Sequence, residues 1–147
     1  MVIPAAPTPV LSQFYVYVTD QCNCSCKHCW IVPSASDRKG LASRFLSPEV
    51  FEAAVLEAKP LGLSAVKWTG GEPTIHPGFP MLLNLQQKHA LAGRLETNGM
   101  KVTPALARLL PASGVTHVSV SLDGARAETH DAIRGMRGAQ GRAGVPP

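Results

Sequence analysis

The amino-acid sequence predicts an α/β fold organised around a parallel β-sheet. Strand-like and helix-like segments alternate along the 147 residues in the order βαβαβαβ, and this alternation implies parallel strands joined by right-handed crossovers. Short polar and glycine-rich motifs follow directly on the predicted strands. Parallel α/β barrels place their sites at the C-terminal ends of the strands. The motifs are therefore expected to meet at one edge of the sheet.

The first strand is expected at residues 14–18 (FYVYV), where aromatic and β-branched side chains occupy both faces. Such a run is typical of a strand buried between two layers. The first helix is expected to begin at Pro48, because Ser47 can cap the free amides and proline suits the first helical position. Pro60 and Gly62 are expected to end this helix.

The remaining elements follow from the same rules. The pair Thr103-Pro104 predicts a helix start of the same kind as Ser47-Pro48. Gly93 is expected to separate the second helix from the third strand. The later strands are predicted at residues 65–69, 94–97 and 116–122, and the later helices at residues 80–89 and from 103 to about 110.

The chain is expected to divide into three parts. Residues 1–12 are rich in Pro and Ala and predict an irregular lead-in, and residues 13–134 predict the folded core. Glycine recurs from residue 135 onward without hydrophobic periodicity, which predicts a disordered tail over residues 135–147. The abrupt change after Arg134 suggests a truncated or frame-shifted product, a hypothesis that the downstream gene sequence would test.

Composition excludes several classes of protein. Hydrophobic residues make up 45% of the chain and charged residues 16%, as in one globular unit. The formal charge of +4 is spread thinly, which argues against nucleic-acid binding. No apolar run approaches the roughly 18 residues of a membrane span, and the N-terminus lacks the pattern of a secretory signal. A reducing cytoplasm is therefore expected, and it suits free thiolates.

All four cysteines lie within residues 22–29, directly after the first predicted strand. A structural zinc site usually draws on two separated pairs, and there is no second pair. Disulfides between such near neighbours rarely reach the required geometry. A thioredoxin-like pair at Cys26 and Cys29 leaves Cys22 and Cys24 without a role. The spacing Cys22-x3-Cys26-x2-Cys29 instead suits three ligands of a [4Fe–4S] cluster whose fourth iron stays open.

This C-x3-C-x2-C loop after a first strand resembles the signature of the radical S-adenosylmethionine (radical SAM) enzymes. Three further stretches follow in the order that the family has them. Residues 69–73 (TGGEP) resemble its GGEP segment, and residues 96–99 (ETNG) resemble the segment that closes its third strand. Residues 119–124 (SVSLDG), with HD at 130–131 and IRG at 133–135, resemble the segment after its fourth strand. Each stretch alone is weak, but four in order are specific.

The resemblance implies a fold, an activity and two cofactors. Radical SAM enzymes have a (βα)6 partial barrel, of which this chain is expected to form the first four strands. The cofactors would be a [4Fe–4S] cluster and S-adenosylmethionine (SAM), and an electron passed to SAM would give a 5′-deoxyadenosyl radical. The SLDG and HDxIRG stretches are similar to those of the subgroup that modifies peptides or assembles cofactors. The implied partners are a peptide or cofactor precursor as substrate and an electron donor such as a flavodoxin or ferredoxin.

The resemblance also assigns roles to single residues. The iron ligands would be Cys22, Cys26 and Cys29. The SAM amino group would meet the turn after the second strand, where the glutamate is a strong acceptor for ammonium hydrogens; the residues are Gly70, Gly71 and Glu72. The adenine would lie near His28. The ribose hydroxyls or the SAM carboxylate would meet polar side chains at two further strand ends, namely Asn98, Ser121 and Asp123.

Several of these residues have simpler interpretations. Cys24 is expected to be a small buried side chain rather than a fourth ligand. His28 could lie on the loop surface, and the Asn98-Gly99 and Asp123-Gly124 pairs could be plain turns. The two tryptophans are expected to serve packing, and the remaining histidines are expected in the core or on the surface; these residues are Trp30, Trp68, His76, His89 and His117.

A second function remains open on the sequence alone. A chain with four strands of a six-stranded barrel could be a non-catalytic fragment that binds an iron–sulfur cluster or zinc, either as a remnant or as half of a split enzyme. Its sheet would have an open edge.

Overall fold

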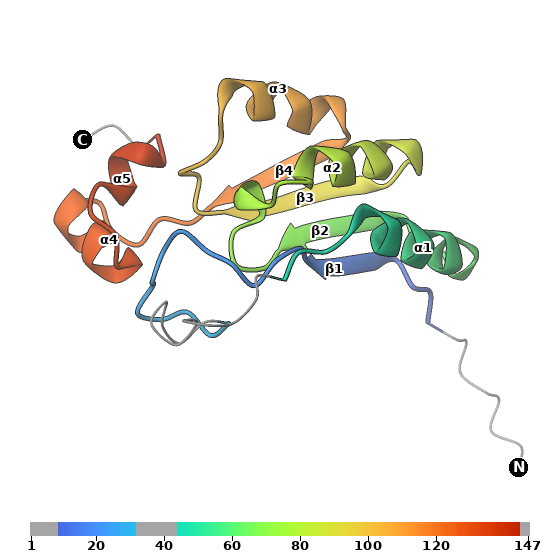
Figure 1. Cartoon of the computed structure of the whole chain (residues 1–147), viewed down its shortest axis with the longest axis horizontal. Coiled ribbons are helices and arrows are strands. Elements are labelled where there is room, and N and C mark those ends of the chain that lie inside the picture. The colour runs from blue at the N-terminus through green and yellow to red at the C-terminus, as the bar shows by residue number, and fades with distance from the viewer. Residues whose placement is uncertain (1–8, 32–43, 145–147) are drawn as a thin grey trace, which may run out of the picture.

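The computed structural model describes residues 9–31 and 44–144. The predicted alternation of strands and helices is confirmed, and two helices follow the fourth strand (Figure 1). The elements are β1 (Gln13–Tyr17), α1 (Pro48–Ala58), η2 (Lys59–Leu61), β2 (Ala65–Thr69), η3 (Pro73–Ile75), α2 (Phe79–Lys88), β3 (Ala92–Thr97), α3 (Pro104–Ala112), β4 (Val115–Val120), α4 (Ala127–Arg134) and α5 (Ala139–Arg142).

The four strands form one parallel sheet in the order β1-β2-β3-β4. Each strand pairs with the next one along the chain, as the first strands of a (βα) barrel do. The register brings Tyr17 beside Thr69 and Thr97 beside Val120, so the strands end at a common edge. The turns that carry the motifs therefore start close together, as the sequence predicts.

The helix starts agree with the predicted caps. Ser47 Oγ accepts a hydrogen bond from the Val50 N–H at 3.2 Å, and Thr103 Oγ1 accepts one from the Leu106 N–H at 3.2 Å. A proline occupies the first helical position after each cap. Capping of this kind stabilises a helix by about 1 kcal/mol.

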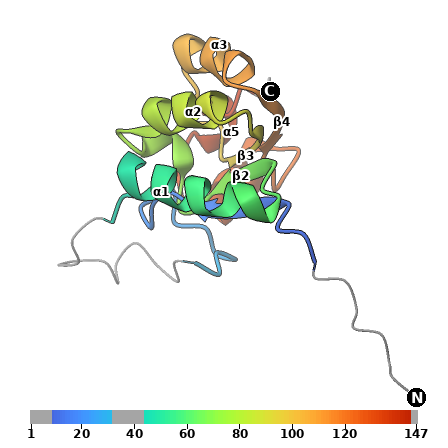
Figure 2. The ribbon, with the colours of Figure 1, turned by 90° about the vertical axis from the view of Figure 1, so that its right-hand side faces the viewer.

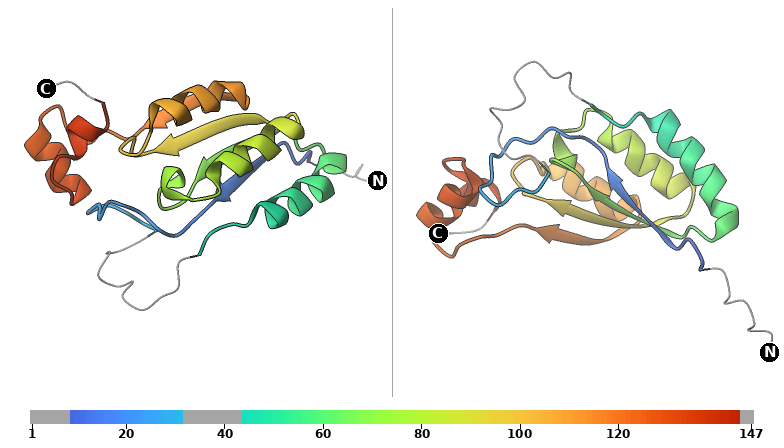
Figure 3. Two further views of the ribbon diagram at one scale, coloured as in Figure 1. Left: turned by 45° about the horizontal axis from the view of Figure 1, so that its top comes forward. Right: turned by 90° about the horizontal axis from the view of Figure 1, so that it is seen from below.

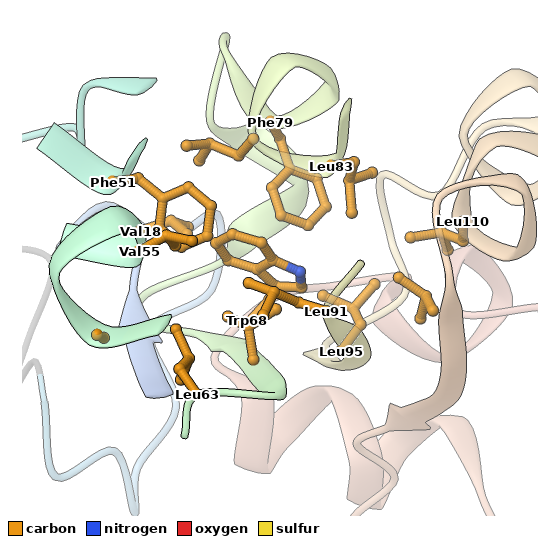
Figure 4. Close-up of a cluster of buried hydrophobic side chains, with 14 residues drawn as sticks. Val18, Phe51, Val55, Leu63, Trp68, Phe79, Leu83, Leu91, Leu95 and Leu110 are labelled. Carbon is orange, nitrogen blue, oxygen red and sulfur yellow. The ribbon is translucent and has the colours of Figure 1, made fainter. Parts of the chain in front are cut away.

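The core lies between one face of the sheet and helices α1, α2 and α3 (Figures 2 and 3). Trp68 of β2 is at its centre, with ring centroids 4.9 Å from Phe51 of α1 and 5.9 Å from Phe79 of α2 (Figure 4). Its indole N–H donates to Gln86 Oε1 at 2.6 Å, and Gln86 Nε2 donates to the Ser113 carbonyl at 2.8 Å. Trp68 is thus a packing residue, as predicted.

The other face of the sheet is largely open, which corrects the expectation that β1 is buried between two layers. Tyr15 is 63% exposed and Tyr17 is 47% exposed. This face also carries Lys67 and Glu96, whose charged groups lie 2.5 Å apart. Helices α1 to α3 all pack on the opposite side, so four strands alone do not enclose a barrel interior (Figure 3).

The structure also differs from the expected disordered tail. Residues 135–144 are described and include α5, in which Ala139 and Gln140 are buried. The Asp131 carboxylate of α4 accepts hydrogen bonds from the Gly138 and Gln140 N–H groups, and these bonds fix the turn between the two helices. Residues 145–147 and most of the expected lead-in lie outside the described residues. None of the helices described here is long and apolar enough to span a membrane.

Candidate functional site

A cavity of about 340 Å³ lies at the C-terminal edge of the sheet. All four cysteines line it, together with residues 69–72 at the end of β2, 96–98 at the end of β3 and 119–121 at the end of β4. Figure 1 shows the cysteine loop, residues 19–30, beside these strand ends, with α4 on its far side. The structure therefore brings the four sequence motifs to one place.

The start of the cysteine loop is bonded to the turn after β2. The Gly71 N–H donates to the Thr19 carbonyl at 2.7 Å, and the Glu72 N–H donates to the Gln21 carbonyl at 2.8 Å. A Cβ on Gly71 would lie only 1.9 Å from the Gln21 carbonyl oxygen. Gly71 is thus required for the close approach of two backbone segments.

The middle of the cysteine loop is hydrogen-bonded to the C-terminus of α4. The Ser25 N–H donates to the Arg134 carbonyl at 3.1 Å, and the Lys27 N–H donates to the Ile133 carbonyl at 2.9 Å. Gly135 has a φ of +63°, and a Cβ there would lie 2.4 Å from the Ser25 carbonyl oxygen. The IRG stretch therefore holds the loop against α4.

The cysteine sulfurs differ in their protonation. The neighbouring Cys24 thiol, as a hydrogen-bond donor, lowers the pKa of Cys22 to about 7, and together with Arg134 it lowers the pKa of Cys26 to about 6. The same hydrogen bonds, together with burial, raise the pKa of Cys24. Cys24 is also buried, with its sulfur 3.5 Å from Met100 Sδ. Cys24 thus has the setting of a small buried thiol, while Cys22 and Cys26 favour the thiolate form that binds metals.

The cysteines line a common cavity rather than surround one point. Among residues 9–31 and 44–144, no three His, Cys, Asp or Glu side chains are placed to hold one metal ion. Zinc needs its ligands gathered about 2.3 Å from one centre. The ligands of a [4Fe–4S] cluster each bind a different iron, so they need only surround a common cavity. The cysteines that line the cavity meet this weaker requirement.

Glu72 is 1% exposed and joins two of the strand-end turns. Its Oε1 accepts hydrogen bonds from Thr74 and from Thr97 Oγ1, the latter at 2.6 Å. Its Oε2 accepts the Asn98 N–H at 2.7 Å. These bonds keep the carboxylate in place at the cavity wall, and Oε2 retains a lone pair for one further donor.

Asn98 is more than a plain turn residue. Its side-chain amide donates to Asn23 Oδ1 at 2.8 Å and lies 3.6 Å from the Cys24 sulfur. Its own Oδ1 accepts the Met100 N–H at 3.0 Å. Asn98 thus fastens the cysteine loop to the turn after β3, and it also lines the cavity.

Of the residues expected to contact the adenine, the ribose or the carboxylate of SAM, some line the cavity and one does not. Ser121 and His28 line the cavity, whereas Asp123 does not. Asp123 Oδ2 lies 2.6 Å from Arg134 Nε, and the Asp123 N–H donates to His130 Nδ1 at 3.1 Å. His28 is exposed, with its Nε2 3.9 Å from Asp123 Oδ1.

Sequence reasoning did not single out several residues that line the cavity, among them Trp30, Glu96 and Arg134. Trp30 is 78% exposed, and its ring packing is an edge-to-face contact with Tyr17. Glu96 accepts a hydrogen bond from Thr69 Oγ1 at 3.2 Å and pairs with Lys67. Arg134 reaches the cysteine loop from α4. The two-residue alternation of β3 could have identified Glu96, but no local signal indicates where Trp30 or Arg134 lies.

The fold and the site together define the class of protein. The family model described as the Radical SAM superfamily matches residues 16–141. The chain belongs to this superfamily.

Similar proteins agree with this membership. The chain is 36% identical over 118 residues to the mycofactocin maturase MftC of Mycolicibacterium smegmatis, covering 80% of this chain and 29% of that protein. It is 35% identical over 122 residues to an AdoMet-dependent heme synthase of Methanosarcina barkeri, covering 83% of this chain and 34% of that protein. The solved structure of Streptococcus suis SuiB bound to the precursor peptide SuiA matches with a TM-score of 0.72 at 20% identity, covering 90% and 29% of the two chains. The chain thus spans about a third of the length of such proteins.

Proposed function

We propose that this chain binds a [4Fe–4S] cluster through Cys22, Cys26 and Cys29 and binds SAM in the adjoining cavity. The observation that supports the proposal best is the convergence of the cysteine loop and three strand-end turns on one cavity of about 340 Å³. Bound there, the two cofactors would supply a 5′-deoxyadenosyl radical for hydrogen abstraction from a substrate.

The chain's own residues would position the cofactors. Gly71 and Gly135 allow the two backbone attachments that hold the cysteine loop. Glu72 Oε2 would accept a hydrogen from the SAM amino group, beside the backbone of Gly70 and Gly71. His28 and Ser121 line the cavity and would face the nucleoside part of SAM. Asn98 also lines the cavity and would contact the ribose hydroxyls or the SAM carboxylate, and Asp123 would act through Arg134.

The proposed substrate is a peptide or a cofactor precursor. The names of the relatives support this class, since one is a maturase, one is a heme synthase and SuiB was solved with a precursor peptide. A flavodoxin or ferredoxin is proposed as electron donor. A reducing cytoplasm, which four free cysteines favour, remains a prediction.

Anaerobic reconstitution with iron and sulfide tests the proposal. The chain should take up about four irons with visible charge-transfer absorption, and SAM plus reductant should then yield 5′-deoxyadenosine. Cys26→Ala should abolish the intact cluster. Cys24→Ala removes the neighbouring thiol and is the matched control, because it should retain iron. Equal iron loss in both variants would contradict the ligand assignment.

A second candidate is a non-catalytic fragment that binds a cluster or zinc. The open sheet face with exposed Tyr15 and Tyr17 favours it, because a substrate cavity is not enclosed on that side. The same reconstitution separates the two functions. A full cluster without 5′-deoxyadenosine would favour the fragment, and stoichiometric zinc without visible absorption would favour a zinc protein.

A further inference from the structure

Arg134 places a buried positive charge against the cysteine loop. The residue is 7% exposed at the end of α4. Its Nη1 lies 3.5 Å from Cys26 Sγ and donates a hydrogen bond to it. Its Nε lies 2.6 Å from Asp123 Oδ2. Because a guanidinium stays charged in proteins, one of the proposed cluster ligands has a permanent cation beside it.

Two sets of contacts fix the position of this cation. The Arg134 and Ile133 carbonyls accept hydrogen bonds from the cysteine loop, so the backbone of residue 134 is held independently of its side chain. Asp123 compensates the charge, and its own N–H donates to His130 Nδ1. A substitution of the Arg134 side chain can therefore leave the backbone attachment of the loop intact. This separation allows an electrostatic role to be measured apart from a structural one.

We propose that Arg134 is a positioning residue that raises the reduction potential of the cluster by donating a hydrogen bond to Cys26, with Asp123 orienting the guanidinium. The inference rests on the proposed function, because it needs Cys26 to be a cluster ligand. Reduction adds one electron, and part of its charge resides on the ligand sulfurs. A cationic N–H donor stabilises that charge more in the reduced form than in the oxidised form.

The test is a redox titration of the reconstituted full chain without SAM, followed by visible absorption and by EPR of the reduced cluster. Arg134→Gln removes the charge and should shift the one-electron equilibrium at least tenfold toward the oxidised form, which equals about 59 mV. Arg134→Lys keeps a charge but lacks the planar guanidinium that places Nε at Asp123 and Nη1 at Cys26, so its shift should be at least threefold but smaller than that of Arg134→Gln. Arg137→Gln removes the same charge from an exposed position three residues later and should stay within twofold.

Iron content and far-UV circular dichroism show whether each variant is folded and loaded. If the wild-type chain takes up no cluster, the proposed function fails before this inference is reached. If the wild type is loaded and Arg134→Gln matches Arg137→Gln in potential, the inference is overturned. A change only in SAM affinity, at unchanged potential, also overturns it and makes Arg134 a SAM ligand. If Arg134→Gln takes up no iron, the reduction potential of Arg134→Lys is compared with that of the wild type instead. Equal potentials of these two proteins would refute the proposal.

Discussion

Gly71→Ala should dislodge the cysteine loop from the turn after β2. The added Cβ would lie 1.9 Å from the Gln21 carbonyl oxygen and 2.5 Å from its carbon. Ordinary contacts of this kind are about 3.5 Å, so the two backbones must separate by more than 1 Å. Residue 71 does not have a positive φ, so the clash alone causes the strain.

The structure gives the magnitude of this effect. Overpacking a close contact typically costs about 1–3 kcal/mol. Separation of the backbones also weakens the hydrogen bonds from Gly71 to Thr19 and from Glu72 to Gln21, each with a net value of about 0.5–1.5 kcal/mol. We therefore expect a loss of about 2–5 kcal/mol in the free energy of unfolding. With a urea m-value of about 2 kcal/mol/M, the midpoint would fall by about 1–2.5 M.

Urea unfolding of the cluster-free chain, followed by tryptophan fluorescence, measures this loss. Gly141→Ala is the matched control, because a Cβ on Gly141 meets no atom within 4 Å and that residue lies in α5. The control should match or slightly exceed the wild type, since alanine favours a helix over glycine. Gly71→Ala should also take up less iron. If Gly71→Ala unfolds at the same urea concentration as Gly141→Ala, the steric argument is refuted.

Three further perturbations follow from buried polar contacts. Gln86→Leu leaves the Trp68 indole N–H and the Ser113 carbonyl without partners, so it should cost about 2–4 kcal/mol of unfolding free energy. The control is Gln87→Leu at an exposed position of α2. Equal stability of the two variants would contradict the role of Gln86 as a bridge between Trp68 and Ser113. Glu72→Gln replaces an acceptor oxygen with a donor among four N–H and O–H groups, so it should cost about 2–4 kcal/mol of unfolding free energy. The control, Glu57→Gln on the surface of α1, should leave the stability unchanged. A loss of SAM affinity without a loss of stability would show that the four hydrogen bonds contribute little to folding. Burial lowers the pKa of His76 below 6.5, and its Nδ1 accepts the Gly78 N–H while Nε2 faces the Leu46 carbonyl. The unfolded chain therefore binds more protons below pH 6.5, so stability should fall as the pH drops from about 7 to 5; His76→Gln should show a smaller change in urea midpoint over this range, and an equal change would assign the effect to other groups.

Local signals predicted most of the fold. The Ser47-Pro48 and Thr103-Pro104 pairs determine where two helices begin, because a cap acts on amides within the next three residues. The strands were predicted to within two residues, and β2 matches its predicted range. Helix α5 was missed because it is anchored by Asp131, which lies just outside the glycine-rich segment that suggested disorder.

The candidate site was predicted less completely. The spacing of the cysteines and the motifs at strand ends indicated which segments meet, and the structure brings these segments to one cavity. The sequence indicated the role of each residue at that cavity less directly. Gly71 contacts backbone, Asn98 holds the cysteine loop, and Asp123 is paired with Arg134 outside the cavity wall. Such contacts join residues far apart in the chain, so no local pattern encodes them.

The sequence by itself determined the order of the elements, the parallel sheet and the family to which the chain belongs. These follow from periodicity, capping and motif spacing, which operate over a few neighbouring residues. Only the tertiary structure decided that Arg134 meets Cys26 across 108 positions, that Glu72 binds two turns together, and that one face of the sheet stays open to solvent. Such contacts depend on how whole elements pack, since the side chains that make them are brought together only after the sheet and helices have assembled.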